Sequence, residues 1–321
     1  MANSPKGAPG PSDIGAKVSV RLHDPAGGYR DILGILESET SIRRRNGSLV
    51  EFHPDAIAIW RKVITPIAKA GHGAPLSLRI REIERVTSAT WPAKESEFLG
   101  DWVLRATGKF TMRANSVLAL GNPGVDLDVG LLQIVDFYNS RSLTPTIHVA
   151  LPTYVELDKK LEQRGWQEKV HGLVMVADIA MEMPFASDIG EWEFSTTPSD
   201  KWIALQNDVG VQEIMRRAPA TYAGLRVGDE LIAVGRAAQN NGWTTLTRLF
   251  VKPELRGRGI GRALVQQLLY AAQEDGISKA FLQVDFKNIE AIGLYESLGF
   301  RQHHTFRYRT LSAPQNQDSN C

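Results

Sequence analysis

The sequence LFVKPELRGRGIGR, residues 249–262, joins a stretch with the pattern of a β-strand to a stretch with the pattern of a helix. Glycines in such a turn let backbone N–H groups point toward one centre, and a helix that begins there adds the partial positive charge of its N-terminus. Arginine side chains add full charges. The stretch therefore predicts a site for an anion such as a pyrophosphate. Its glycines and arginines are Arg256, Gly257, Arg258, Gly259, Gly261 and Arg262.

Two common phosphate-binding loops do not fit this stretch. A Walker loop continues with Gly-Lys-Ser/Thr, whereas an arginine and an alanine follow Gly261. A dinucleotide-binding loop has the spacing G-x-G-x-x-G, but after Gly257 and Gly259 the third position holds Arg262. The pattern that remains is R-x-x-G-x-G, which begins at Arg256.

This pattern and its surroundings resemble the signature of the GCN5-related N-acetyltransferase (GNAT) family. An apolar strand precedes the glycine loop, Asn288 follows the next strand, and Tyr295 lies in the helix after it, in the family's order and spacing. The resemblance covers about residues 190 to 310. The whole chain also resembles a bacterial group sometimes labelled histone acetyltransferase-like, in which a small SH3-like barrel precedes two GNAT modules.

The resemblance implies where a coenzyme binds. In the family, coenzyme A lies between two strands that splay apart, and its pyrophosphate rests on the glycine loop. Acetyl-CoA is then the cosubstrate, and no metal is implied. The implied coenzyme-binding residues are Leu249, Phe250, Val251, Arg256, Gly257, Arg258, Gly259, Ile260, Gly261, Arg262 and Asn288.

The same resemblance implies that Tyr295 is the general acid that protonates the departing thiolate. A phenol with a pKa of about 10 can donate a proton in the transition state without being ionised at neutral pH. The alternative is a helix residue that only packs against the sheet. Its placement seven residues after Asn288 favours the catalytic role.

The general base is not assigned by the sequence. Many relatives place a glutamate on the strand before the glycine loop, but residues 243–251 contain no carboxylate. Glu230, Asp285 and a chain of water molecules are candidates. Asp285 is expected to satisfy a loop instead.

Other side chains are candidates for the acceptor side of the site. His303 and His304 are adjacent on the predicted last strand, so we expect them to face opposite sides, which disfavours a shared metal. One of them could still line the acceptor cleft and act as a base, although a packed or solvent-facing pair is the simpler interpretation. Trp202 and Trp243 are further candidates for acceptor contacts, with packing as the default.

Composition is typical of a soluble, cytoplasmic protein with several domains. The 321 residues include 37 Lys and Arg against 36 Asp and Glu, so no charge excess favours nucleic acid or an anionic membrane. The one cysteine is Cys321, which excludes an intramolecular disulfide and a cysteine metal cluster. The N-terminal stretch has no apolar core like that of a signal peptide, and we expect no membrane span.

The predicted fold is α/β, with two tandem GNAT modules whose mixed, mostly antiparallel sheets are flanked by helices. A small all-β SH3-like barrel precedes them, and Arg43, Arg44 and Arg45 make it a candidate site for a protein partner, with a solvated hairpin edge as the simpler interpretation. A tight turn is expected at Asn46 and Gly47. The expected segments are a disordered N-terminus (1–13), the barrel (14–66), a linker (67–75), a degenerate GNAT-like module (76–185), the catalytic module (186–311) and a flexible tail (312–321).

The order of elements in the middle of the chain repeats near its end. Two glycines bound each copy, with a spacing of 41 across 124–165 and of 40 across 259–299. The middle loop, 121–124, has no arginine pair, and Leu161 stands where Tyr295 stands in the later copy. We interpret the middle copy as non-catalytic and as shaping the substrate cleft. The alternative is that its loop binds a second coenzyme.

The leading hypothesis is therefore acetyl transfer from acetyl-CoA to a primary amine of a small molecule or peptide. A competing hypothesis is a coenzyme A-binding regulatory protein without catalysis, which the missing carboxylate favours. A third is transfer of a longer acyl group. The residues that bind the coenzyme do not identify the acceptor.

Overall fold

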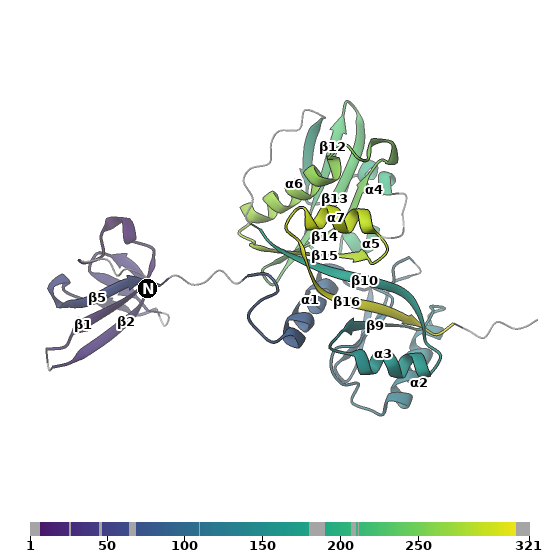
Figure 1. The fold of residues 1–321 in the computed structure, drawn as a ribbon, viewed down its shortest axis with the longest axis horizontal. Helices are drawn as coiled ribbons and strands as arrows, with labels where there is room; N and C mark the ends of the chain where they lie inside the picture. The colour runs from purple at the N-terminus through teal and green to yellow at the C-terminus, as the bar shows by residue number, and fades with distance from the viewer. Residues whose placement is uncertain are drawn as a thin grey trace, which may run out of the picture. The chain divides into compact units, whose positions relative to one another are not determined.

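The computed structural model describes residues 7–25, 27–44, 47–63, 69–108, 110–179, 190–206, 210 and 212–312. They fall into two compact units, one within residues 1–68 and one within residues 69–321 (Figure 1). Arg45 of the arginine run, Asn46 of the expected turn and residues 313–321 of the expected tail lie outside the described residues.

The first unit is a five-stranded antiparallel sheet with the order β4-β3-β2-β1-β5. Its inward side chains, including Val18, Leu36 and Trp60, form a core of their own. The likeness of this unit to an SH3-like barrel stays a prediction. Its strands are β1 (Lys17–His23), β2 (Tyr29–Ser38), β3 (Ser41–Arg43), β4 (Leu49–Glu51) and β5 (Ile57–Lys62).

Regular structure begins before residue 14, where the sequence predicted that the first unit starts. Pro11–Asp13 form a short 3-10 helix, and Asp13 Oδ1 lies 2.7 Å from Lys62 Nζ of β5. The stretch predicted to be disordered therefore contributes an ion pair to the first unit. A second 3-10 helix, Pro54–Ala56, leads into β5.

The second unit is built on one sheet of eleven strands, flanked by seven α-helices of the described residues. Its strands are β6 (Glu95–Leu99), β7 (Trp102–Ala106), β8 (Val117–Leu118), β9 (Thr146–Leu151), β10 (Gln167–Asp178), β11 (Glu191–Ser195), β12 (Ala220–Val227), β13 (Glu230–Asn240), β14 (Trp243–Val251), β15 (Lys279–Asp285) and β16 (Arg301–Thr310). Its helices are α1 (Leu76–Thr90), α2 (Leu127–Asn139), α3 (Val155–Gln163), α4 (Asp200–Gln206), α5 (Gln212–Met215), α6 (Ile260–Glu274) and α7 (Ile289–Glu296), with a 3-10 turn at Pro253–Leu255. None of the described helices is long and apolar enough to cross a membrane.

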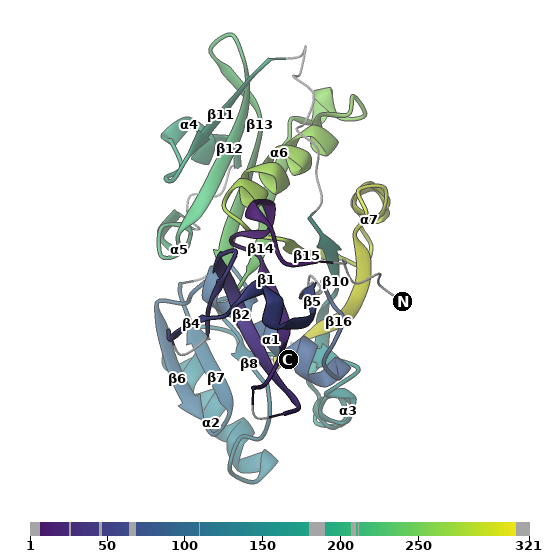
Figure 2. The same ribbon diagram turned by 90° about the vertical axis from the view of Figure 1, so that its left-hand side faces the viewer.

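Apart from the edge strand β11, corresponding strands of this sheet follow in the same order from both ends. The order runs β11-β12-β13-β14-β15-β10-β16-β9-β8-β7-β6, and β14–β15 and β8–β9 are the parallel pairs. We call the elements from β6 to β10 the first copy and those from β12 to β16 the second copy. Each copy thus gives its last strand to the other, and β10 and β16 lie side by side (Figures 1 and 2). The chain is duplicated, but the two copies share one sheet.

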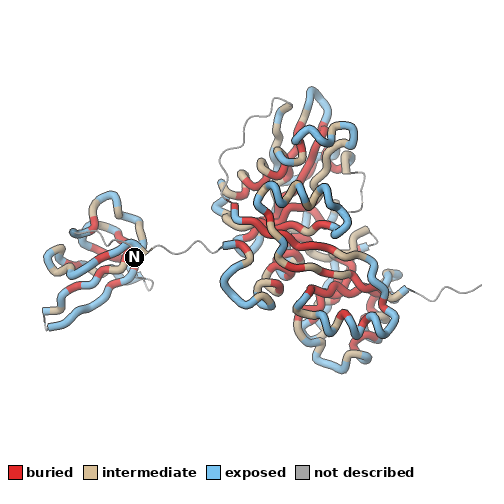
Figure 3. The backbone as a smooth tube through the Cα atoms, viewed as in Figure 1, coloured by how far each residue is buried: buried red, intermediate tan, exposed pale blue. Residues whose placement is uncertain are grey.

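The sequence of β10 explains its central place. Residues 172–177 are all buried, without the alternation of a strand that has one face in water (Figure 3). Leu173 and Met175 pack with α6 on one face of the sheet, whereas Val174 and Val176 pack with α1 on the other. A strand covered on both faces must have neighbours at both edges, and β15 and β16 supply them.

Part of the expected linker is fixed to the second unit. The Ala70 N–H donates to Asp178 Oδ1 at 2.5 Å, and Arg301 donates to the Ala70 carbonyl. Gly71 takes a φ of 69°, and a β-carbon there would come within 2.7 Å of His303. The chain therefore enters the second unit alongside the ends of β10 and β16.

The buried carboxylate of Glu84, a residue of α1, contacts both copies. Glu84 Oε2 lies 3.0 Å from His148 Nε2 on β9, and Glu84 Oε1 lies 2.9 Å from His304 Nε2 on β16. All three side chains are almost fully buried. Burial alone raises the pKa of Glu84, but the two histidines outweigh it and hold this pKa well below its usual range. Glu84 is therefore a buried anion.

The prediction that His303 and His304 face opposite sides of their strand is wrong. Their Nδ1 atoms lie 2.8 Å apart. Val174 of β10 pairs with His304 and Met175 pairs with Gln302, so His303 is an extra residue in β16. This β-bulge interrupts the alternation on which the prediction rested.

We predict that His303 makes the second unit less stable in acid. Burial, together with His304 and Arg79, lowers the pKa of His303 to about 4. Because an unfolded histidine has a pKa of about 6.5, the unfolded chain binds this proton first, and the stabilisation present above that pH is lost as the pH falls toward about 4. Between neutral pH and a pH of about 4.5, the free energy of unfolding of His303→Asn should fall less than that of the wild type, by on the order of 1 kcal/mol.

Urea unfolding at several pH values measures this difference. Tryptophan fluorescence reports mainly on the second unit, because Trp60 is the one tryptophan of the first. His72→Asn removes an exposed histidine of the second unit and is the control. Equal losses of stability in wild type and His303→Asn would contradict the prediction.

Candidate active site

A gap opens in the sheet between β14 and β15. The two strands pair from Trp243 and Lys279 as far as Leu246 and Leu282, and then separate. On its other edge β14 has a bulge, since Val234 pairs with Phe250 but Arg236 pairs with Thr247. Within the bulge Arg248 takes a φ of 58°, in the left-handed region that residues with a side chain rarely adopt. The bulge thus turns β14 away from β15.

This gap holds a cavity of about 560 Å³, which we call the strand-gap cavity. A second cavity of about 520 Å³, the loop cavity, extends from it over the glycine loop to the start of α6. Both are lined by Leu249, Asn288, Ala291 and Tyr295. The remaining walls of the strand-gap cavity are Gln206, Leu246, Thr247, Arg248, Leu282, Gln283, Val284 and Asp285.

The glycine loop leaves the N-terminus of α6 uncapped. Gly259 is the N-cap residue, with a φ of 79°, and no side chain accepts a hydrogen bond from the first turn. Gly257 has a φ of 75°, so both residues take a conformation that strains other amino acids. The first-turn N–H groups and the helix dipole face the loop cavity, which suits an anion.

The structure brings the predicted coenzyme residues together with one exception. All of them line the loop cavity except Arg258, which is exposed and lines neither cavity. Arg256 donates from Nε to the Val251 carbonyl at 3.2 Å, and Arg262 donates from Nη2 to Ser297 Oγ at 2.7 Å. The Asn288 Oδ1 accepts from the Ala291 N–H at 3.1 Å and so caps α7.

Tyr295 lies where the two cavities meet. Its ring is partly buried and packs on Phe300, with the ring centres 5.9 Å apart. Burial raises the pKa of Tyr295 to about 12, so the phenol stays protonated at neutral pH. No hydrogen bond of its hydroxyl is made within the described residues. A protonated donor thus stands at the end of the gap.

Of the side chains that the sequence suggested as the base, only Asp285 lines the strand-gap cavity. Glu230 pairs with Lys252 and lines neither cavity. Asp285 lines the strand-gap cavity, where its Oδ1 accepts from the Lys287 N–H at 2.8 Å, so it satisfies a loop as expected. His303 and His304 line neither cavity.

The two tryptophans suggested for the acceptor side belong to the core. Trp202 donates to the Ala223 carbonyl at 3.0 Å, and Trp243 donates to Glu82 Oε1 at 2.8 Å. Sequence reasoning missed Gln206, Arg248 and Gln283. Nothing in the regular pattern of strand residues around Arg248 indicates the bulge that places it in the cavity.

The corresponding loop of the first copy is occupied by its own side chains. The Asn122 N–H donates to Asp101 Oδ2 at 2.9 Å, the Gly124 N–H donates to Asn122 Oδ1 at 2.7 Å, and Asp126 caps α2. A carboxylate therefore lies where an anionic ligand would bind. Leu161 is fully buried in the core.

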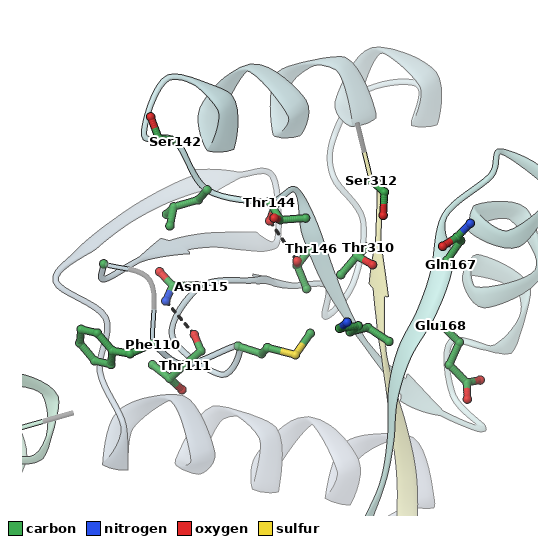
Figure 4. Close-up of a pocket in the computed structure, with 14 residues that line it drawn as sticks. Phe110, Thr111, Asn115, Ser142, Thr144, Thr146, Gln167, Glu168, Thr310 and Ser312 are labelled. Carbon is green, nitrogen blue, oxygen red and sulfur yellow. Dashed lines mark hydrogen bonds between the residues drawn. The ribbon is translucent and has the colours of Figure 1, made fainter. Parts of the chain in front are cut away.

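The equivalence of Leu161 and Tyr295 is visible in the backbone. The Trp166 N–H donates to the Leu161 carbonyl and the Phe300 N–H donates to the Tyr295 carbonyl, both at 3.0 Å. The first copy thus has the backbone of the site without its phenol. A third cavity, of about 620 Å³, is lined mainly by the first copy, with Thr310 and Ser312 at its edge, and by none of the predicted site residues (Figure 4).

Known proteins resemble this chain in sequence and in fold. Residues 78–309 match the family described as probable histone acetyltransferase Rv0428c C-terminal. The chain belongs to that family. It is an N-acetyltransferase of the GNAT type, as its relatives are.

Two similar curated proteins match this chain over almost their whole length. The chain is 28% identical over 327 residues to a probable histone acetyltransferase of Mycobacterium tuberculosis, covering 92% of this chain and 94% of that protein. It is 29% identical over 245 residues to the uncharacterized N-acetyltransferase YobR of Bacillus subtilis, covering 72% of this chain and 98% of that protein.

Solved structures show the same fold at low sequence identity. A GCN5-related N-acetyltransferase from Kribbella flavida superposes with a TM-score of 0.57 at 13% identity, over 72% of this chain and 95% of its own. A tandem GNAT protein from the clavulanic acid biosynthesis pathway superposes with a TM-score of 0.51 at 14% identity, over 76% and 89%.

We predict that the acetyltransferase binds one acetyl-CoA per chain, in the second copy. Gly259→Ala should weaken binding about tenfold, because a side chain at this φ costs about 1–2 kcal/mol. Gly124→Ala makes the same change in the first copy, where φ is 76°, and is the matched control. Isothermal titration gives both the affinity and the stoichiometry. Two coenzymes per chain, or equal effects of the two variants, would refute this prediction.

Proposed function

We propose that this acetyltransferase moves the acetyl group of acetyl-CoA directly to a primary amine in the strand-gap cavity. The observation that carries the proposal is the position of Tyr295, a protonated phenol at the junction of the loop cavity and the gap. A thioester at this junction would have its sulfur beside a proton donor and its carbonyl carbon open to the gap.

The coenzyme would lie with its pyrophosphate on the glycine loop. Gly257, Gly259 and Gly261 present backbone N–H groups there, and Arg256 and Arg262 are already held in place by their hydrogen bonds. Arg258 would contribute from the solvent side. The pantetheine arm would follow β14 at Leu249, Phe250 and Val251 and pass Asn288, because these residues connect the loop to the gap.

The reaction then needs one bond formed and one broken. The amine nitrogen attacks the thioester carbon, the carbon–sulfur bond breaks, and the thiolate takes a proton, giving the acetylated amine and coenzyme A. Tyr295 donates that proton. The proton of the amine leaves through water or Asp285, the one carboxylate of the strand-gap cavity, and the phenol is restored from solvent.

Tyr295→Phe tests the role of the phenol. The ring would still pack on Phe300, so coenzyme affinity should hold, whereas kcat should fall by a factor on the order of 10². Thiol release from acetyl-CoA with a panel of amines measures the rate. Tyr270→Phe removes a phenol of α6 that lines neither cavity, and should leave kcat unchanged. An unchanged rate in Tyr295→Phe would exclude the phenol as the acid.

The acceptor class stays open between small molecules and peptides. A relative matched over 58 residues at 40% identity is named as an alanine N-acetyltransferase of ribosomal protein bS18, and a peptide N-terminus is therefore one amine to include. A protein partner of the first unit is tested by pull-down, and transfer of a longer acyl group by thiol release from longer acyl-CoA donors.

A coenzyme A-binding regulatory role is the second candidate. The hydrogen bond of Asp285 to its own loop favours it, because it leaves the gap without a dedicated base. Tight coenzyme binding without turnover on any amine, together with a bound partner protein, would favour regulation over catalysis.

A further inference from the structure

One side of α1 forms the wall of a cavity that lies apart from the active site. This cavity has a volume of about 720 Å³ and shares no lining residue with the strand-gap cavity or the loop cavity. Its volume is in the range of pockets that hold small molecules. We call it the α1 cavity. It is lined by Leu78, Arg81, Glu82, Arg85, Val86, Ala89, Asn240 and Asn241.

The helical spacing of α1 brings these side chains together. Residues three or four positions apart share one face of a helix, and the lining residues follow this spacing from Leu78 to Ala89. The nearby Ile83 is fully buried in a cluster with residues of the sheet, which holds the helix in place. Arg81 and Arg85, four positions apart, are therefore neighbours in the wall of the cavity.

Within the described residues, neither arginine forms an ion pair or a side-chain hydrogen bond. The Nε of Arg81 is buried and finds no acceptor there, whereas Arg85 is exposed. Two like charges at this spacing repel one another and destabilise a helix. Because a guanidinium stays charged in proteins, loss of a proton cannot relieve the repulsion. A bound anion would relieve it.

The carboxylate in the wall of the cavity has other partners. Glu82 Oε1 accepts from Trp243 Nε1 at 2.8 Å and lies 3.9 Å from Lys279 Nζ. The Lys279 Nζ also lies 4.5 Å from the centre of the Trp243 ring, so it is held beside this carboxylate. The charge of Lys279 thus balances that of Glu82.

Nearby titratable groups do not balance the two arginines either. Tyr154 is close enough for the charges of both to act on its phenol, but burial raises the pKa of Tyr154, so the phenol is neutral at neutral pH. Asp101 acts on the same phenol, and its Oδ2 accepts from the Asn122 N–H. In the part of the chain that the structure describes, Asp101 forms no ion pair with either arginine. Two positive charges in the wall are therefore left unpaired by these residues.

The rest of the wall offers amide groups and apolar surface. Asn240 and Asn241 lie at the turn between β13 and β14, and both are exposed, so their amide N–H groups can donate to a ligand. Leu78 is about half exposed, and with Val86 and Ala89 it forms an apolar strip beside the arginines. The wall thus combines donors for an anion with a surface for a carbon skeleton.

We propose that the α1 cavity binds a small organic phosphate, with its dianionic group on Arg81 and Arg85 and its carbon skeleton on the apolar strip. A guanidinium can donate to two phosphate oxygens at once, and one dianion balances both positive charges. A carboxylate would balance only one. Because this cavity shares no residue with the strand-gap cavity or the loop cavity, the inference does not depend on the proposed function.

Phenyl phosphate is the probe, because it joins a phosphate to an apolar ring. At a pH of about 8 it carries two negative charges, since the second pKa of such an ester is about 6, whereas phenyl sulfate has a similar shape and one charge. Isothermal titration of the full chain at low ionic strength should show about tenfold tighter binding of phenyl phosphate. Equal affinities, or no binding of phenyl phosphate, would overturn the proposal.

Variants assign the binding to the α1 cavity. Arg81→Gln and Arg85→Gln each remove one guanidinium, and each should weaken binding of phenyl phosphate about tenfold. Arg216→Gln removes an exposed arginine after α5 that does not line this cavity, and should keep the affinity. Gly259→Ala should keep it too, because the glycine loop lines a different cavity. Binding that only Gly259→Ala weakens would place the phosphate at the glycine loop, contrary to the proposal.

Thermal unfolding separates loss of the site from loss of the fold. Phenyl phosphate should raise the Tm of the wild type and of Arg216→Gln, but not that of the double variant Arg81→Gln and Arg85→Gln. Without ligand, the double variant should unfold at no lower temperature than the wild type, because the repulsion between the two guanidiniums is gone. If phenyl phosphate stabilises the double variant as much as the wild type, these arginines do not hold the phosphate, and the proposal fails.

Discussion

The pairing of β10 with β15 and β16 is the constraint on which the second unit depends. It places the last strand of each copy in the other half of the sheet, and it buries the apolar run 172–177 on both faces. Once β15 is bound on this side, its other edge meets β14 alone, and the bulge in β14 opens the strand-gap cavity there. The site in the second copy is thus held in shape by a strand of the first.

The two copies share one backbone arrangement but carry different side chains at the equivalent positions. At α6 the helix N-terminus faces a cavity and two arginines, whereas at α2 the loop N–H groups are satisfied by Asp101 and Asn122. The phenol of Tyr295 is replaced by the aliphatic side chain of Leu161, which only packs. The first copy instead contributes His148 of β9, which lies 3.0 Å from the buried carboxylate of Glu84. His304 of the second copy lies against the other oxygen of that carboxylate, so Glu84 also fixes how the copies fit.

The sequence could predict which residues line the loop cavity, the proposed coenzyme side of the site, because that cavity depends on local chemistry. Glycines with positive φ, arginines beside them and a helix start lie within 14 residues, 249–262, and the structure brings nearly all of them to one cavity. The acceptor side depends on features with no local pattern. The bulges at Arg248 and His303 arise from register against partner strands, and the strand exchange pairs residues more than a hundred positions apart. An apolar run can indicate a central strand without indicating its neighbours.

The exchanged strand also affects how the chain is made. β10 is complete at Asp178, but β15 begins at Lys279 and β16 at Arg301, about a hundred residues later in synthesis. Until those strands leave the ribosome, the most apolar edge of the sheet has no partner, and such edges favour association between chains. Newly made protein is therefore most exposed to aggregation during the second half of its translation, and a chain that stops before β15 would keep that edge without a partner.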